Sequence, residues 1–195
     1  MIPTPMKPTV VDPGLPPAVC IMLSSVSPMP SAKPPAESSV TLHQLMLPEH
    51  GNALGNVHGG VIMRIVDETG AICAMRHART PCVTIAIDSM TFRQPVHLGD
   101  LLVCSAMVTW VGRTSIEVGV HVHAENPVTG EISHTNSAYV VYVALGPDGR
   151  PTQAPPLALV DEEAKRHFEE GAERQQRRLS QRPSVPPRMT SRPPK

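Results

Sequence analysis

The sequence predicts an α+β fold, in which one long buried helix is wrapped by a five-stranded antiparallel sheet and a further helix stands at the C-terminal end. Two observations predict it. An apolar stretch with helical spacing runs from Gly60 to about Ala78. One strand-like run precedes this stretch and four follow it, separated by turn residues. The order of one strand, a long helix and four strands is typical of a single sheet curled around a helix.

The prolines divide the chain into a folded middle and two unusual ends. Ten of the 23 prolines precede Glu37 and five follow Gln181. Both ends are proline-rich, and the apolar run Val19–Leu23 is too short to form a core alone, so we expect the ends to be disordered. The predicted organisation is a disordered arm over 1–37, a folded domain over 38–157, a basic helix over 158–181 and a disordered tail over 182–195.

The bulk properties exclude several classes of protein. The net charge is zero, which gives no reason to expect binding to nucleic acid or to an anionic membrane. No run approaches the roughly 20 apolar residues that a membrane span requires. The first 37 residues contain no arginine and lack the pattern of a secretory signal, so we expect a cytoplasmic protein. The cysteines have no metal or disulfide spacing and are expected to be reduced: Cys20, Cys73, Cys82 and Cys104.

The first strand and the long helix are predicted from hydrophobic spacing. Ser39 to Leu47 alternates loosely and predicts a strand, and a glycine-rich loop follows it. The helix is apolar around most of its circumference, so we expect other structure to surround it, and we expect Pro81 to end it. Its apolar positions recur at intervals of three and four: Ile62, Ile65, Val66, Thr69, Ile72, Cys73 and Met75.

Four more strands are predicted after the helix, followed by a charged helix from Leu159 to about Leu179. Acidic residues begin this last helix and basic residues end it, as the helix dipole favours. A five-stranded sheet leaves two open edges, which self-association would cover. The predicted strands cover Cys82–Phe92, Leu101–Val111, Thr114–Glu125 and Ile132–Leu145.

The start of the long helix is the main candidate for chemistry. His58 is followed by Gly59 and Gly60, and a glycine pair at a helix start leaves backbone N–H groups free to face an anion. Asp67 lies two turns further along the same helix, where we expect its carboxylate to serve as a base beside that anion site. Oxyanion donors and a base at one place are the minimum requirement for acyl transfer.

Six segments, in order over about 120 residues, resemble the hotdog-fold acyl-CoA thioesterases, in the branch of the brown-fat and brain acyl-CoA hydrolases and their small bacterial relatives. They are N-A-L-G-N-V-H-G-G at Asn52–Gly60, V-D-E-T-G-A-I at Val66–Ile72, R-H-A-R at Arg76–Arg79, V-T-I-A-I-D-S-M-T-F-R-Q-P-V-H-L-G-D at Val83–Asp100, V-G-R-T-S-I-E-V at Val111–Val118 and E-N-P-V-T-G-E at Glu125–Glu131.

The resemblance implies hydrolysis of acyl-CoA thioesters by a homodimer or a trimer of dimers, with no cofactor and no metal. It implies that Asp67 is the general base or nucleophile, that Asn52 holds the thioester carbonyl or the attacking water, and that Gly59 and Gly60 form the oxyanion hole. In such enzymes the asparagine and the aspartate that meet come from different protomers. The coenzyme A contacts it implies are Thr84, Arg113, Thr114, Ser115, Arg177 and Arg178.

Several alternatives stay open at this point. Asp67 and Asn52 can also be read as an ordinary helix acid and an ordinary turn asparagine, and the two glycines as close-packing residues. His58 stands where this branch often has an aromatic residue, and it either contacts substrate or caps the loop. His121 and His123 share a strand face but have no further ligand beside them. The alternative functions are a hotdog dehydratase using His58 with Asp67, and a non-catalytic acyl-CoA-binding domain.

Overall fold

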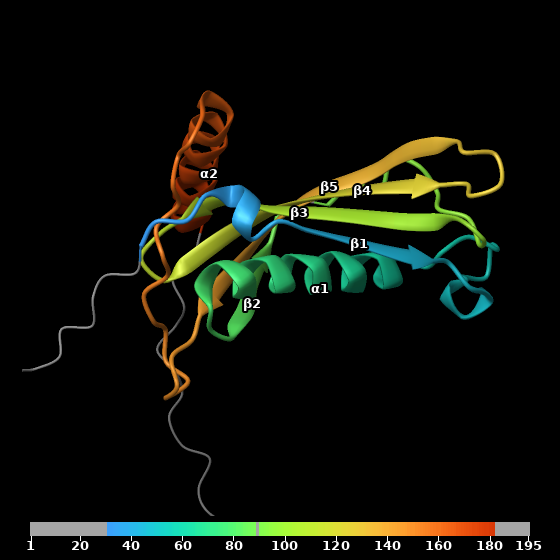
Figure 1. Cartoon of the computed structure of the whole chain (residues 1–195). Coiled ribbons are helices and arrows are strands. Elements are labelled where there is room, and N and C mark those ends of the chain that lie inside the picture. The colour runs from blue at the N-terminus through green and yellow to red at the C-terminus, as the bar shows by residue number, and fades with distance from the viewer. Residues whose placement is uncertain (1–30, 89, 182–195) are drawn as a thin grey trace, which may run out of the picture.

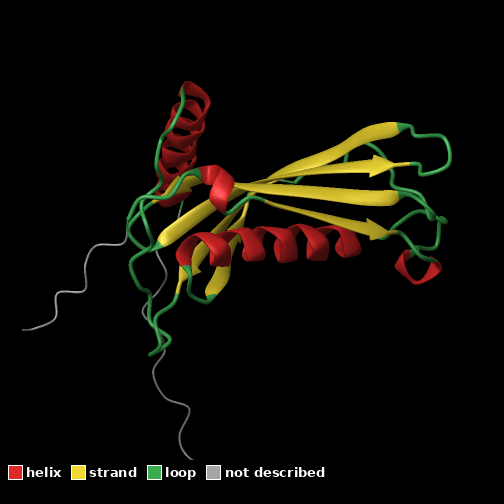
Figure 2. Cartoon of the chain, viewed as in Figure 1, coloured by secondary structure: helices red, strands yellow, loops and turns green. Residues whose placement is uncertain are grey.

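A computed structural model describes residues 31–88 and 90–181, which form one five-stranded sheet and two long helices (Figures 1 and 2). All strand pairs are antiparallel, in the order β1-β3-β4-β5-β2. Helix α1 (Gly59–Ala78) crosses one face of the sheet, and α2 (Glu162–Ser180) stands on the other face at one end. The strands are β1 (Val40–Leu45), β2 (Cys82–Ile87), β3 (Leu101–Val111), β4 (Ser115–Glu125) and β5 (Ile132–Ala144).

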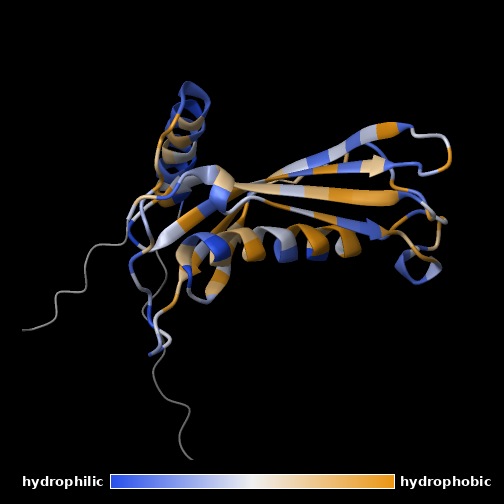
Figure 3. Ribbon diagram, in the orientation of Figure 1, coloured by the Kyte–Doolittle hydropathy of each residue, from blue (hydrophilic) through white to orange (hydrophobic). Residues whose placement is uncertain are grey.

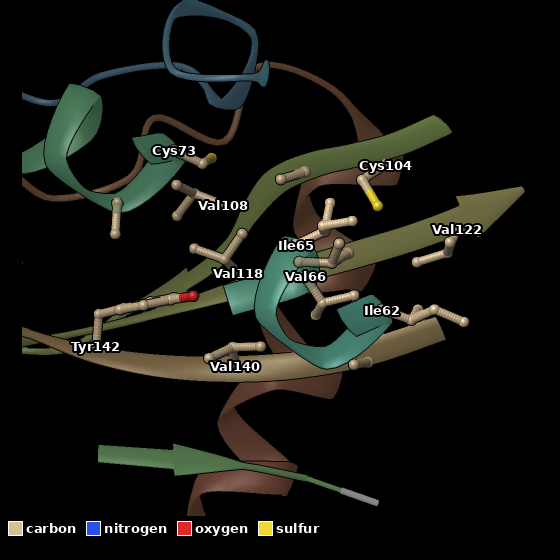
Figure 4. Close-up of a cluster of buried hydrophobic side chains, with 14 of the residues drawn as sticks. Ile62, Ile65, Val66, Cys73, Cys104, Val108, Val118, Val122, Val140 and Tyr142 are labelled. Atoms are coloured by element: carbon tan, nitrogen blue, oxygen red, sulfur yellow. The ribbon is translucent and has the colours of Figure 1, made fainter. Parts of the chain in front are cut away.

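The core lies between α1 and the sheet face that curves around it, so the predicted α+β fold is confirmed. Strand side chains that point to this face meet Ile62, Ile65 and Val66 of the helix (Figure 4). Strand β4 is buried over most of its length because α1 covers one face, and Arg174 and Arg178 of α2 reach Glu117 on the other. The hydrophobic colouring accordingly concentrates on α1 and the sheet, whereas α2 is mostly hydrophilic (Figure 3).

Helix α1 has an identifiable start and stop. His58 is its N-cap, and the His58 Nδ1 atom accepts a hydrogen bond from the Gly60 N–H at 3.0 Å. Arg79 ends the helix in the left-handed conformation, with φ of 59°, and its N–H donates to the Met75 carbonyl. The helix therefore ends two residues before Pro81, which we expected to be its terminator.

The expected wrapping of α1 is incomplete within one chain. Its buried face meets the sheet, but Met63, Ile72 and Met75 remain between 37% and 43% exposed. Edge strand β2 exposes further apolar side chains, including Val83 and Ile85. Helix α1 and β2 are neighbours in the fold, so these residues leave apolar surface open along one edge of the domain.

Two predicted boundaries were wrong. The strand expected over Cys82–Phe92 ends at Ile87, because β5 pairs with it only that far and a register shift between Thr84 and Ala86 already bends it. Residues 31–37, which we assigned to the disordered arm, include a 3-10 turn. Lys33 is hydrogen-bonded there to the backbone of Pro156 and Ala158. Residues 1–30 and 182–195 lie outside the described part of the chain.

Helix α2 is fixed to the sheet by a buried carboxylate. Glu117 of β4 is fully buried, and its Oε1 accepts hydrogen bonds from the Thr109 hydroxyl and the Arg174 guanidinium, both at 2.8 Å. Arg178 also donates to Glu117, and its Nε lies 3.3 Å from an oxygen of Asp88. A buried charge is tolerated when it is paired and hydrogen-bonded, so these arginines are part of the structure that holds α2 in place.

Candidate active site

Asp67 lies at the middle of α1, half-buried on the side that faces β2 and β5. Its Oδ1 atom accepts a hydrogen bond from the Thr84 hydroxyl at 2.7 Å. Glu68 points elsewhere, as the rotation of about 100° per helical residue requires, and pairs with Arg64 at 2.8 Å on the exposed side. Of the two neighbouring acids, only Asp67 is held by residues from outside its own helix.

Tyr142 of β5 is a second partner of Asp67 that our sequence reasoning did not find. Its hydroxyl donates to the Asp67 carbonyl oxygen at 3.0 Å and lies 3.4 Å from Oδ1. Burial, followed by the nearby Asp67 charge, raises the pKa of the phenol far above its usual range, so Tyr142 is a neutral donor at pH 7. Tyr142 is 75 residues from Asp67, and no local sequence signal marks that contact.

Asn52 holds its own loop together. Its side-chain oxygen accepts hydrogen bonds from the backbone N–H groups of Leu54 and Asn56 at 2.8 and 3.2 Å. These hydrogen bonds are those of an ordinary turn asparagine, which was the alternative interpretation of Asn52. It also fixes the side chain, so that the amide NH₂ is the group left to face outward. Asn52 lines a pocket of about 330 Å³, the asparagine pocket, whose other walls include Gly59, Ile62, Phe92 and Arg93.

The glycine pair is less open than the sequence indicated. The Gly60 N–H donates to His58, so that donor is occupied within the chain. The Gly59 N–H has no hydrogen-bond partner among residues 31–88 and 90–181, and Gly59 lines the asparagine pocket. His58 therefore caps the helix, which is one of the two roles that we considered for it. Of the two predicted oxyanion donors, the Gly60 N–H is occupied and the Gly59 N–H is free of partners among the described residues.

The expectation that Asp67 lies beside the same anion site was wrong for a single chain. Asp67 follows Gly59 by eight residues, a separation of about 12 Å along the helix axis. Accordingly, Asp67 is not among the residues that line the asparagine pocket. One chain therefore presents two half-sites, one with Asn52 and Gly59 and one with Asp67, Thr84 and Tyr142.

The residues predicted to contact coenzyme A lie in separate parts of the structure. Thr84 contacts Asp67 itself. Ser115 and Arg178 share a pocket of about 310 Å³ with Ile85 and Ala86 of β2. Arg178 also lines the adjoining arginine pocket of about 500 Å³, together with Arg174 and Arg177. Arg113 and Thr114 lie in the β3–β4 turn and use their carbonyl oxygens to hold Ala154 and Ala144, and neither lines these pockets.

Neither the cysteines nor the histidines of the described residues form a further candidate site. Cys73, Cys82 and Cys104 are free thiols, whereas Cys20 lies outside the described residues. His121 bonds the Ser137 hydroxyl at 3.0 Å. Within residues 31–88 and 90–181, no group of three or more possible ligands could hold a metal ion. No helix in this part of the chain is long and apolar enough to cross a membrane.

Comparison with known proteins gives one consistent family. The model of the thioesterase superfamily matches residues 54–131. The acyl-CoA thioester hydrolase YciA of Salmonella typhimurium is 35% identical over 123 residues, which cover 61% of this chain and 92% of that protein.

Two solved structures extend the similarity to the whole fold. A hexameric acyl-CoA thioesterase is 36% identical with a TM-score of 0.73, over 77% of this chain and 96% of that one. The acyl-CoA hydrolase of Staphylococcus aureus, solved with butyryl coenzyme A and coenzyme A, is 30% identical with a TM-score of 0.71, over 76% of this chain and 91% of that one. Variants of the Staphylococcus enzyme with alanine in place of one asparagine, one aspartate and one threonine have also been solved.

Proposed function

We infer the chemistry of the two half-sites from the family: this chain belongs to the thioesterase superfamily and is an acyl-CoA thioester hydrolase with the hotdog fold. We propose that Asp67 is its catalytic carboxylate and that Asn52 and the Gly59 N–H hold the thioester. The observation that carries this proposal is the 2.7 Å hydrogen bond by which Thr84 holds the Asp67 carboxylate on the side of edge strand β2.

The spacing of residues supports the same assignment. In the Staphylococcus hydrolase the substituted asparagine precedes the substituted aspartate by 15 residues, and the substituted threonine follows it by 17. Asn52, Asp67 and Thr84 have the same spacings of 15 and 17 here. Asn52, Asp67 and Thr84 are also residues of the two half-sites described above.

A second copy of the chain completes the site in this proposal. Asn52 and Asp67 belong to different half-sites, so a thioester held by Asn52 requires a carboxylate from elsewhere. The apolar surface of α1 and β2 lies next to Asp67 and Thr84, where burial against a partner would stabilise a dimer. Structural neighbours that are hexameric support self-association of this kind.

The proposed reaction follows from these positions. The acyl carbonyl lies against the Gly59 N–H at the α1 N-terminus, where the helix dipole stabilises the developing oxyanion. Asp67 removes a proton from water that attacks the carbonyl carbon, or attacks that carbon itself to form an anhydride that water then cleaves. In both routes the C–S bond breaks, and the products are the free acid and coenzyme A. No metal or cofactor takes part.

A thiol-release assay tests this function against the dehydratase alternative. We expect the full-length protein to release free thiol from acyl-CoA thioesters and to leave the C=C bond of an enoyl-CoA unhydrated. The reason is that Asn52, Asp67 and Thr84 have the spacings of the three residues substituted in an acyl-CoA hydrolase, whereas His58 Nδ1 is already occupied by the Gly60 N–H. A panel of acyl-CoA chain lengths also identifies the preferred substrate. Enoyl-CoA hydration without thiol release would contradict the proposal, and tight acyl-CoA binding without turnover would favour the non-catalytic alternative.

The two arginines that we assigned to coenzyme A phosphates are expected to behave differently. Arg178 is paired with Glu117 and Asp88, so Arg178→Ala should lower the free energy of unfolding by about 2 kcal/mol. Arg177 is outside that network and lines the arginine pocket, so we expect Arg177→Ala to raise KM about five- to tenfold. Thermal unfolding and steady-state kinetics measure both effects. A lowered melting temperature for Arg177→Ala with unchanged KM would contradict this division.

A further inference from the structure

Two hydroxyl groups meet the Asp67 half-site from neighbouring strands. Thr84 of β2 and Tyr142 of β5 are directly paired in the sheet register, so their side chains share the face that looks toward α1. The Thr84 hydroxyl donates to the Asp67 carboxylate, and the Tyr142 hydroxyl donates to the carbonyl of the same residue. The Tyr142 oxygen is also 3.4 Å from the carboxylate oxygen that Thr84 binds.

We propose that Tyr142 is a positioning residue that fixes Asp67 for catalysis by holding α1 at that point and by donating toward its carboxylate. The inference rests on the proposed role of Asp67. Tyr142 itself is fully buried among the side chains that face α1, so it acts through Asp67 and does not touch the substrate (Figure 4).

Gly70 supplies the space that this contact requires. A Cβ atom built on Gly70 would lie 2.3 Å from the Tyr142 hydroxyl oxygen and 3.1 Å from the ring carbon that bears it. Any side chain at position 70 would therefore displace the tyrosine or the helix. Gly70 is one turn after Asp67 on the same helix, so a glycine here lets the phenol cross α1 and reach the Asp67 carbonyl.

Three thiols of α1, β2 and β3 are neutral at pH 7. Burial raises the pKa of Cys73 on α1 and of Cys104 on β3 to about 12, and the pKa of Cys82 on β2 to about 11. Burial also raises the pKa of Tyr142, which stays protonated. Cys73 and Cys82, the two thiols that act on Tyr142, therefore add no charge beside its hydroxyl at pH 7.

Replacement of Tyr142 by phenylalanine tests the proposal in the full-length protein. We expect Tyr142→Phe to lower kcat about five- to tenfold with KM within twofold of wild type, because the lost donor orients the carboxylate and binds no substrate. The readout is the split between kcat and KM, measured at a temperature well below the melting temperature of the variant. A merely structural role would lower the melting temperature and leave kcat at the measuring temperature unchanged.

Tyr139→Phe is the matched control, since it removes the hydroxyl of the other tyrosine of the same strand. Tyr139 lies on the opposite face, where it lines the arginine pocket with its ring 3.6 Å from the Arg174 guanidinium carbon. The comparison is therefore made on kcat, which Tyr139→Phe should leave unchanged. An unchanged kcat in Tyr142→Phe, together with an inactive Asp67→Ala, would overturn the positioning role alone. Full activity of Asp67→Ala would instead overturn the proposed function.

Gly70→Ala, alone and combined with Tyr142→Phe, tests the same contact from the helix side. Gly70→Ala should lower kcat because its methyl group collides with the Tyr142 hydroxyl. Tyr142→Phe removes the hydroxyl oxygen, the atom in closest contact with that methyl group. The double variant should therefore lose less activity than the product of the two single losses. Additive losses would show that Gly70 and Tyr142 act separately and would contradict the contact.

Discussion

Replacement of Asp67 by alanine is expected to lower kcat for acyl-CoA hydrolysis by at least about 1,000-fold, the upper range of what a positioned base or nucleophile contributes. The Asp67 carboxylate is the acid that strands β2 and β5 hold in place, through Thr84 and Tyr142. The loss should appear in kcat and not in KM, because Asp67 acts on the attacking water or on the carbonyl carbon only as the transition state forms. Initial rates of thiol release measure both constants.

Glu68→Ala is the matched control for this experiment. Glu68 is the adjacent acid on the same helix, but it is exposed and pairs with Arg64, so its loss should leave kcat within about twofold of wild type. Gel filtration should show the same oligomer for both variants and for wild type. Turnover by Asp67→Ala within tenfold of wild type would exclude Asp67 as the catalytic carboxylate.

Two inactive variants are expected to restore activity to each other when they share an oligomer. Asn52 and Asp67 lie in different half-sites of one chain, so in our proposal each active site takes Asn52 from one protomer and Asp67 from its partner. A pair formed from Asn52→Ala and Asp67→Ala then has one site with both defects and one intact site. A dimer purified through both tags contains one copy of each variant, so about half of the wild-type activity should return, since an isologous dimer contains two equivalent sites and one of them is intact.

The design needs co-expression of the two variants with different affinity tags, followed by purification through both tags. Asp67→Ala co-expressed with Asp67→Asn is the control, because two defects at one position leave no intact site in any pairing. Activity that stays at the level of the single variants would show that Asn52 and Asp67 act within one protomer. That result would contradict the two-protomer site while leaving the role of Asp67 untouched.

Local spacing explains why most of the fold could be predicted. The boundaries predicted for β3 were those observed, and α1 was predicted to within one residue, because apolar periodicity and turn residues act over short stretches. Strand β2 was predicted five residues too long, because its end depends on how far β5 pairs with it. Residues 31–37 were assigned to the arm because nothing in their composition shows that Lys33 bonds to a segment more than 120 residues away.

The candidate site shows the same contrast between what the sequence predicted and what the tertiary structure decided. Residue type and spacing predicted a role for Gly59 and Asp67, because these are local properties of one chain, and the resemblance to the thioesterases added Asn52; their roles in the reaction are our proposal. Only the tertiary structure decided that Thr84 and Tyr142 hold Asp67 and that His58 occupies the Gly60 N–H. It also showed that Asp67 does not line the pocket of Asn52 and Gly59, because its side chain is directed toward β2 and β5.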